Sequence, residues 1–178
     1  CPPRITRDTP LAAASANMGR IDARLAELGI TLATVPAPLA SYVPFTKSGN
    51  LVYTSGHVPF TDDLKALHQG KVGVEYTVDE GAAFARRVGT LLLSTVKTAA
   101  DGDLDKVKKI VKIVGFVNCP SDFTQQPEVI NGCSNLLLEV FGEAGKHARS
   151  AVGTNSLPRN VPVEIEMIVE LESSGSKL

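Results

Sequence analysis

The sequence predicts an α/β (α+β) domain in which a mixed sheet of about six strands carries two helices on one face. Apolar residues recur at helical spacing in two long segments, 78–100 and 127–145. Other segments, above all 40–60 and 161–171, alternate between apolar and polar residues as strands do. The predicted order is two strands, helix, strand, helix and two strands, and two helices can cover only one face of such a sheet.

The first third of the chain predicts a short helix and a hairpin. Residues 21–30 place apolar residues at helical spacing, and Gly29 can end the helix. Within 40–60, two short strands flank a turn at Ser48-Gly49-Asn50, since glycine and asparagine tolerate the positive φ of such turns. Residues 61–77 are polar and contain glycines, so we expect a loop.

The middle of the chain predicts the longest helix and a buried strand. Asp79 and Glu80 lie in the first turn of the helix over 78–100, where acidic side chains favour the helix dipole, and Gly102 follows its end. The segment 111–119 is mostly apolar and predicts a strand buried on both faces.

The last third predicts a second long helix and two strands. Pro127 suits the start of the helix over 127–145, and a strand begins at Ala148. From Val161 to Leu171 every second residue is apolar, while three carboxylates point the other way: Glu164, Glu166 and Glu170. The sheet face without helices needs cover, so we expect the chain to form oligomers.

Composition narrows the classes of function. The chain has 178 residues, which suits one domain, and a net charge of −1, which provides no basic footprint for nucleic acid. No run approaches the length of a membrane-spanning helix. Three cysteines and three histidines are scattered without the spacing of a zinc site, so we expect no metal.

The ends of the chain predict segments outside the domain. Residues 1–17 are rich in Pro, Ala and Ser, and we interpret them as a leader or flexible arm before a single domain over 18–172. Residues 173–178 form a tail that ends in Ser176-Lys177-Leu178, which matches the peroxisomal address. A peroxisome-type organelle is therefore the expected location, with the cytoplasm as the alternative.

Several runs together resemble one known family. They are SYVPFT and LVYTSGHVP (41–59), VGFVNCPSDF (114–123), VINGCSNLLLEVFGEAGKHARSAV (129–152) and LPRNVPVEIE (157–166). The chain is similar to the Rid family (reactive intermediate deaminases, also called the YjgF family and sometimes labelled L-PSP endoribonucleases), and most similar to its longer-loop subgroup. The resemblance covers roughly residues 21–171.

The resemblance implies a fold, an assembly and an activity. The fold is chorismate-mutase-like, and three chains form a homotrimer with a cleft between each pair of neighbours. The activity is the hydrolysis of short-lived enamines and imines, such as 2-aminoacrylate, to 2-keto acids and ammonia without a cofactor. The substrate is then a small carboxylate that carries a C=N or enamine group.

The resemblance also assigns site residues. Arg149 would bind the substrate carboxylate, which suits a guanidinium because its fork donates two parallel charge-assisted hydrogen bonds. Glu164 would hold the attacking water and act as its general base. Four further positions match substrate-binding residues of the family: Tyr42, Ser55, Gly56 and Asn131. The non-functional alternatives are an ion pair between Arg149 and Glu164 or Glu166, and a surface or packing role for each of the other residues.

The chain departs from the family pattern at two positions and in one loop. His57 stands where many members have glutamine, Ala151 where many have cysteine, and the loop over 59–73 is longer. The histidine either adds a titratable group near the cleft or is simply packed. These departures affect the identity of the substrate more than the type of reaction.

Two other functions remain open at this stage. One is a non-catalytic module that binds a small carboxylate or acts like a chaperone, because the Arg149 site would serve either purpose. The other is an endoribonuclease, against which the absence of a histidine pair by spacing, of a basic excess and of tryptophan argues.

Overall fold

The computed structural model describes residues 18–33 and 41–173. The predicted leader over 1–17 and the Ser176-Lys177-Leu178 end of the predicted tail lie outside the described residues. Among the residues that are described, no helix is long and apolar enough to cross a membrane.

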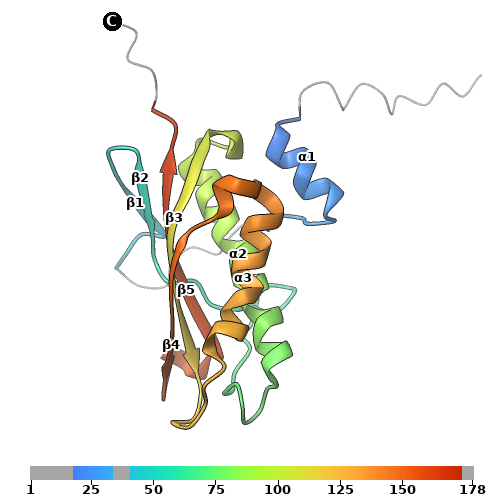
Figure 1. Ribbon diagram of the computed structural model, residues 1–178, viewed down its shortest axis with the longest axis vertical. Coiled ribbons are helices and arrows are strands. Elements are labelled where there is room, and N and C mark those ends of the chain that lie inside the picture. Colours follow the sequence, from blue (N-terminus) through green and yellow to red (C-terminus); the bar gives the residue numbers. More distant parts are fainter. Residues whose placement is uncertain (1–17, 34–40, 174–178) are drawn as a thin grey trace, which may run out of the picture.

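The described chain forms two layers, a five-stranded mixed sheet and a layer of helices on one of its faces (Figure 1). The strands, in chain order, are β1 (Phe45–Ser48), β2 (Leu51–Thr54), β3 (Val107–Asn118), β4 (Ala148–Thr154) and β5 (Val163–Leu171). Their order in the sheet is β1-β2-β5-β3-β4, and only β3 and β4 run parallel. The predicted fold class is confirmed, with five strands where about six were expected.

Three α-helices lie on the covered side: α1 (Arg20–Glu27), α2 (Val78–Ala99) and α3 (Gln126–Phe141). A capping box begins α2, because the Thr77 side chain accepts from the Glu80 backbone N–H and the Glu80 side chain accepts from the Thr77 N–H. The helix predicted over 127–145 is shorter than expected, since Gly142–Gly145 form a 3₁₀ turn. A Cβ on Gly132 would lie 1.9 Å from the Ala82 carbonyl oxygen, so glycine lets α3 approach the α2 backbone closely.

The core lies between the sheet and the helices, and β5 shows its boundary. Val163, Ile165, Met167 and Val169 are at most 1% exposed and face the helices, as the alternation predicted. Strand β3 begins at Val107, before the predicted position 111. The prediction that this strand is buried on both faces is wrong for a single chain. Its other face is only partly buried, because no described element covers that side of the sheet.

The segment between β2 and α2 is a loop, as predicted, and it is anchored at the end of the sheet. Lys71 Nζ donates to the Asn118 side-chain oxygen at 2.8 Å, and the Gly70 N–H donates to the Asn160 carbonyl at 2.7 Å. Asn118 is fully buried and binds Asn160 Oδ1 in turn at 3.0 Å. The segment is therefore part of the framework at the ends of β3 and β5.

Candidate functional site

Arg149 lies at the sheet edge on the side of the helices. Strand β4 is an edge strand, and Arg149 is in register with Ile113, which is buried beneath the helices. The Arg149 Nη1 group donates to Asn131 Oδ1 at 2.8 Å and to Ser134 Oγ at 3.1 Å, both on α3. The guanidinium is thus held by neutral oxygen atoms while Arg149 as a whole remains exposed.

The alternative of an ion pair between Arg149 and the β5 carboxylates is not what the structure contains. In the described ranges, no salt bridge involves Arg149, Glu164 or Glu166. Asn131, for which the resemblance predicted a substrate-binding role, contacts Arg149 directly. Its side-chain oxygen contributes to the position of the guanidinium.

Two residues beside Arg149 were missed by the sequence analysis. Ser134 is buried on α3, and its hydroxyl lies 3.1 Å from His147 Nε2 as well as 3.1 Å from Arg149 Nη1. His147 precedes β4 and its Nδ1 lies 2.6 Å from the Gly145 carbonyl oxygen. The available signal was spacing, because Ser134 follows Asn131 by three residues on one helix face and His147 precedes Arg149 by two.

Glu164 lies on the other side of the sheet, the open face. It is in register with Phe116 on β3 and is half-buried. Burial raises the pKa of the Glu164 carboxyl above its usual value of 4.5, and the negative charge of Glu166 raises it further. A Cβ on Gly56 would lie 2.0 Å from Glu164 Oε1, so the absence of a side chain at Gly56 makes room for the carboxylate.

A short irregular turn brings Gly56 to Glu164. The Thr54 hydroxyl accepts from the Met167 N–H at 2.9 Å, and the His57 backbone pairs with Ile165. Two residues, Ser55 and Gly56, therefore face the single residue Glu166, which resembles the two-against-one count of a β-bulge. The irregular turn places Gly56 directly against the Glu164 side chain.

The remaining predicted residues lie near this turn. The Ser55 hydroxyl donates to the Val43 carbonyl at 2.6 Å, and the Ser55 N–H donates to the Pro44 carbonyl. Tyr42 precedes that segment and is 54% exposed. Ser55 thus fastens the strand that leads from Tyr42 into β1, while the ring of Tyr42 is available to a neighbouring molecule.

His57 is a packed histidine, the second of the two alternatives for this residue. It is 7% exposed, its Nδ1 lies 2.8 Å from the Ser55 carbonyl, and its Nε2 lies 2.7 Å from the Thr95 hydroxyl on α2. Burial lowers the pKa of the imidazole, although the hydrogen bond to Ser55 opposes that effect. The neutral ring connects the Ser55–Gly56 turn to the helix layer.

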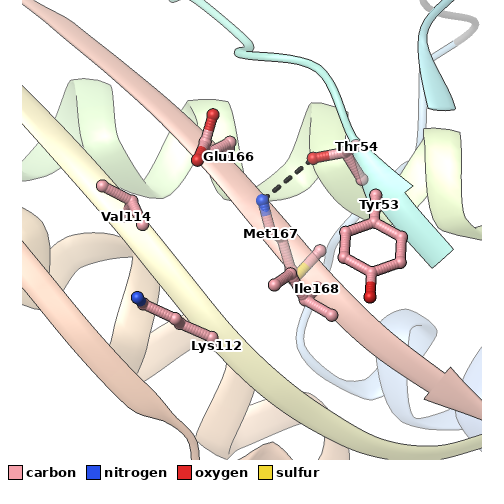
Figure 2. Close-up of a pocket in the computed structure, with 7 residues that line it drawn as sticks. All are labelled: Tyr53, Thr54, Lys112, Val114, Glu166, Met167 and Ile168. Carbon is pink, nitrogen blue, oxygen red and sulfur yellow. Dashed lines mark hydrogen bonds between the residues drawn. The ribbon is translucent and has the colours of Figure 1, made fainter. Parts of the chain in front are cut away.

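A hollow of about 140 Å³ lies in the open face between β2, β5 and β3 (Figure 2). Its lining includes Tyr53, Lys112 and Glu166, but neither Arg149 nor Glu164. Figure 2 also shows the hydrogen bond from the Met167 N–H to the Thr54 hydroxyl at its rim. The hollow therefore lies beside Glu166, and Glu164 is outside it.

The predicted site residues therefore form two groups. The arginine group, Arg149 with Asn131, Ser134 and His147, faces the helices at the β4 edge. The glutamate group, Glu164 with Gly56 and the neighbouring turn, faces the open side two strands away. One chain does not bring Arg149 and Glu164 together. In the part of the chain that is described, no three His, Cys, Asp or Glu side chains are grouped as metal ligands.

Comparison with known proteins identifies the family. Residues 22–171 match the family model described as "YjgF/chorismate_mutase-like, putative endoribonuclease". The chain belongs to the YjgF/Rid family. The resemblance noted in the sequence is confirmed, as is the chorismate-mutase-like fold.

The names of the similar proteins differ in whether they state a function. The chain is 44% identical over 156 residues to protein TCP17 of Trypanosoma cruzi, which covers 87% of this chain and 96% of that protein. It is 45% identical to the crystal structure of a protein of unknown function from Agrobacterium tumefaciens, with a TM-score of 0.79, covering 85% of this chain and 92% of the other. A 2-iminobutanoate/2-iminopropanoate deaminase of Dermatophagoides farinae is 26% identical over 143 residues, covering 80% and 95%.

Proposed function

We propose that the protein hydrolyses small imines and enamines of the 2-aminoacrylate type to 2-keto acids and ammonia. The observation that carries the proposal is that one chain of this family holds two suitable groups. One is the exposed guanidinium of Arg149, which forms no salt bridge with the described residues, and the other is the half-buried carboxylate of Glu164, whose pKa is raised. The relative from Dermatophagoides farinae, named as an imine deaminase, supports the same reaction class.

Arg149 binds the carboxylate of the substrate. Asn131 and Ser134 occupy the Nη1 side of the guanidinium, which leaves the Nε and Nη2 side for an incoming carboxylate. Two parallel hydrogen bonds on that side fix the plane of the substrate as well as its position. A lysine would supply charge without that orientation.

Glu164 acts as the general base for water. As the water oxygen bonds to the imine carbon, the carboxylate takes a proton from the water and the C=N electron pair moves to nitrogen, which Glu164 then protonates. Glu164 then moves the hydroxyl proton of the resulting carbinolamine to its nitrogen. The electrons left on oxygen form the carbonyl as the C–N bond breaks, and ammonia leaves. Glu164 returns to its starting state, and the 2-keto acid remains.

The complete site requires a second copy of the chain. Since Arg149 and Glu164 face opposite sides of one sheet, a cleft between two copies can bring the arginine group of one to the glutamate group of the other. The exposed ring of Tyr42 is accessible to such a neighbour. A homotrimer with three such clefts would also cover the open face of the sheet.

The decisive experiment compares imine hydrolysis by the wild type and by Arg149→Ala. Imines are generated in situ by an amino-acid oxidase or a serine/threonine dehydratase, and 2-keto acid formation is followed over time. We expect acceleration by the wild type and a loss of kcat/KM of about 100-fold or more in the variant, because two hydrogen bonds to a charged group disappear. Absence of acceleration on a broad panel of imines would contradict the proposal and leave a module that only binds carboxylates.

A further inference from the structure

Arg149 is the end of a continuous chain of hydrogen bonds that begins at the protein backbone. The Gly145 carbonyl lies 2.6 Å from His147 Nδ1, and His147 Nε2 lies 3.1 Å from Ser134 Oγ. Ser134 Oγ then accepts from Arg149 Nη1 at 3.1 Å. Neither Ser134 nor His147 is among the site residues that the family resemblance supplied.

When the His147 ring is neutral, the chemistry of these groups fixes the direction of every hydrogen bond. A carbonyl oxygen can only accept, so His147 Nδ1 carries the proton that Gly145 binds. In the neutral ring, Nε2 is then an acceptor, and the Ser134 hydroxyl donates to it. The lone pairs of Ser134 Oγ are left to accept from Arg149, which can only donate.

The start of the chain is rigidly placed. A Cβ on Gly145 would lie 2.2 Å from the Leu137 carbonyl oxygen, so this glycine packs directly on the backbone of α3. Ser134 is buried on the same helix. Both ends of the His147 side chain are therefore fixed relative to α3, although His147 itself lies outside that helix.

We propose that Ser134 and His147 are positioning residues of the carboxylate subsite. They hold Nη1 of Arg149 so that the Nε and Nη2 side stays open and in one plane, which selects a planar carboxylate that can accept two hydrogen bonds. The inference rests on the proposed function in taking that carboxylate to be the substrate's. It adds two residues that act through Arg149 and do not touch the substrate.

Binding of the 2-keto acid product tests the inference. Ser134→Ala removes one oxygen atom from a buried helical position, and alanine favours the helix. We expect the Kd of 2-oxobutanoate, measured by calorimetry, and the KM of the imine to rise together by about 5- to 20-fold, while kcat changes by less than about 3-fold. His147→Phe should raise the same two constants. The double variant should bind 2-oxobutanoate as tightly as the single variant with the higher Kd, because both substitutions interrupt the same chain of hydrogen bonds.

A matched control is available on the neighbouring helix. Ser94 is also partly buried, but its hydroxyl donates to the Thr90 carbonyl within α2. Ser94→Ala should leave the Kd of 2-oxobutanoate unchanged. An equal change in both serine variants would assign the effect to general loosening of the helices and overturn the inference.

A spectroscopic readout is independent of turnover. In ¹⁵N NMR spectra of histidine-labelled protein, His147 of the wild type should be protonated at Nδ1 and unprotonated at Nε2, and Ser134→Ala should shift the Nε2 resonance. A proton on Nε2 in the neutral wild type would overturn the inference.

The two proposals fail in different ways. Arg149-dependent binding of 2-oxobutanoate without imine hydrolysis would refute the deaminase and leave the positioning pair intact. Imine hydrolysis with wild-type Kd and KM in Ser134→Ala would refute the positioning pair alone. Absence of 2-oxobutanoate binding by the wild type would refute both.

Discussion

The arginine group and the glutamate group are built in opposite ways. The guanidinium of Arg149 is exposed, carries a permanent charge and is held by neutral oxygens on a rigid helix. The carboxylate of Glu164 is half-buried, lies near the like charge of Glu166 and packs against Gly56, which has no side chain. The first group suits the binding of an anion, and the second suits the exchange of a proton.

Under the proposed function, this difference explains why one chain alone would be an incomplete site. A general base benefits from partial burial, whereas an anchor for an incoming anion must remain accessible. The chain meets these demands on two faces of one sheet, and the contact between copies is what would combine them. Each prediction below tests one side of this comparison.

The largest effect is expected for Glu164→Gln. Loss of the general base should lower kcat by about 10²- to 10⁴-fold. Since the pKa of Glu164 is raised in the folded protein, its contribution to stability is present at low pH and is lost as the pH rises through that pKa. The variant should therefore have a Tm about 1–2 °C above the wild type at pH 7, a small gain because the group is only half-buried. Parallel kinetics and thermal melts check both signs, and a lower Tm would show a structural role instead.

Mixed assemblies test whether the two groups come from different copies. Arg149→Ala and Glu164→Gln should each be inactive alone. When the two variants are co-expressed and form mixed assemblies, about a quarter of the clefts should combine an intact Arg149 with an intact Glu164. Those clefts should recover about a quarter of the wild-type activity. The control is a mixture of separately purified variants before any exchange of subunits. Lack of recovery in verified mixed assemblies would place both residues of a site in one chain.

Gly56→Ala changes the glutamate group without removing its base. The new Cβ would meet Glu164 Oε1, and the flexible carboxylate would move aside. We expect kcat to fall by about 10-fold, while 2-oxobutanoate binding at Arg149 stays near the wild-type value. In the Glu164→Gln background, Gly56→Ala should have almost no further effect on kcat. An equal loss of kcat in the wild-type and Glu164→Gln backgrounds would mean that Gly56 does not act through Glu164.

Glu166→Gln should move a pH profile. Burial first, and then the charge of Glu166, raise the pKa of Glu164, so removal of that charge lowers it. The acid limb of kcat/KM should shift to lower pH, since the base stays deprotonated to a lower pH. Glu170→Gln, farther along β5, is the matched control and should leave the limb in place.

The smallest effect is expected at His57. Burial lowers the pKa of the folded-state imidazole from 6.5, so the stability it contributes is present above pH 6.5 and is lost as the pH falls toward the folded-state value. The Tm of the wild type should fall between pH 7 and pH 5 by a few degrees more than that of His57→Gln. If the Tm of the wild type and of His57→Gln changed equally with pH, His57 would not take up a proton on unfolding.

The alternation of Val163 to Leu171 made β5 and its two faces predictable, because a strand with one buried face leaves a clear period of two. The family motif located Arg149 and Glu164. Their separation onto opposite faces was not predictable, since it depends on the parallel register of β3 and β4. Ser134 was not predicted because it lies within the apolar pattern of a helix. His147 comes close to it only because Gly145 packs on α3.

The strand order has a consequence for how the protein is made. Strand β5, the last in the chain, lies between β2 and β3 in the sheet. During synthesis, α2, β3, α3 and β4 can assemble as soon as they emerge, but the β1–β2 hairpin cannot join the sheet until β5, the strand it pairs with, appears. The arginine group can thus form before β5 is available, whereas the glutamate group, which includes a β5 residue, is completed only once β5 has emerged.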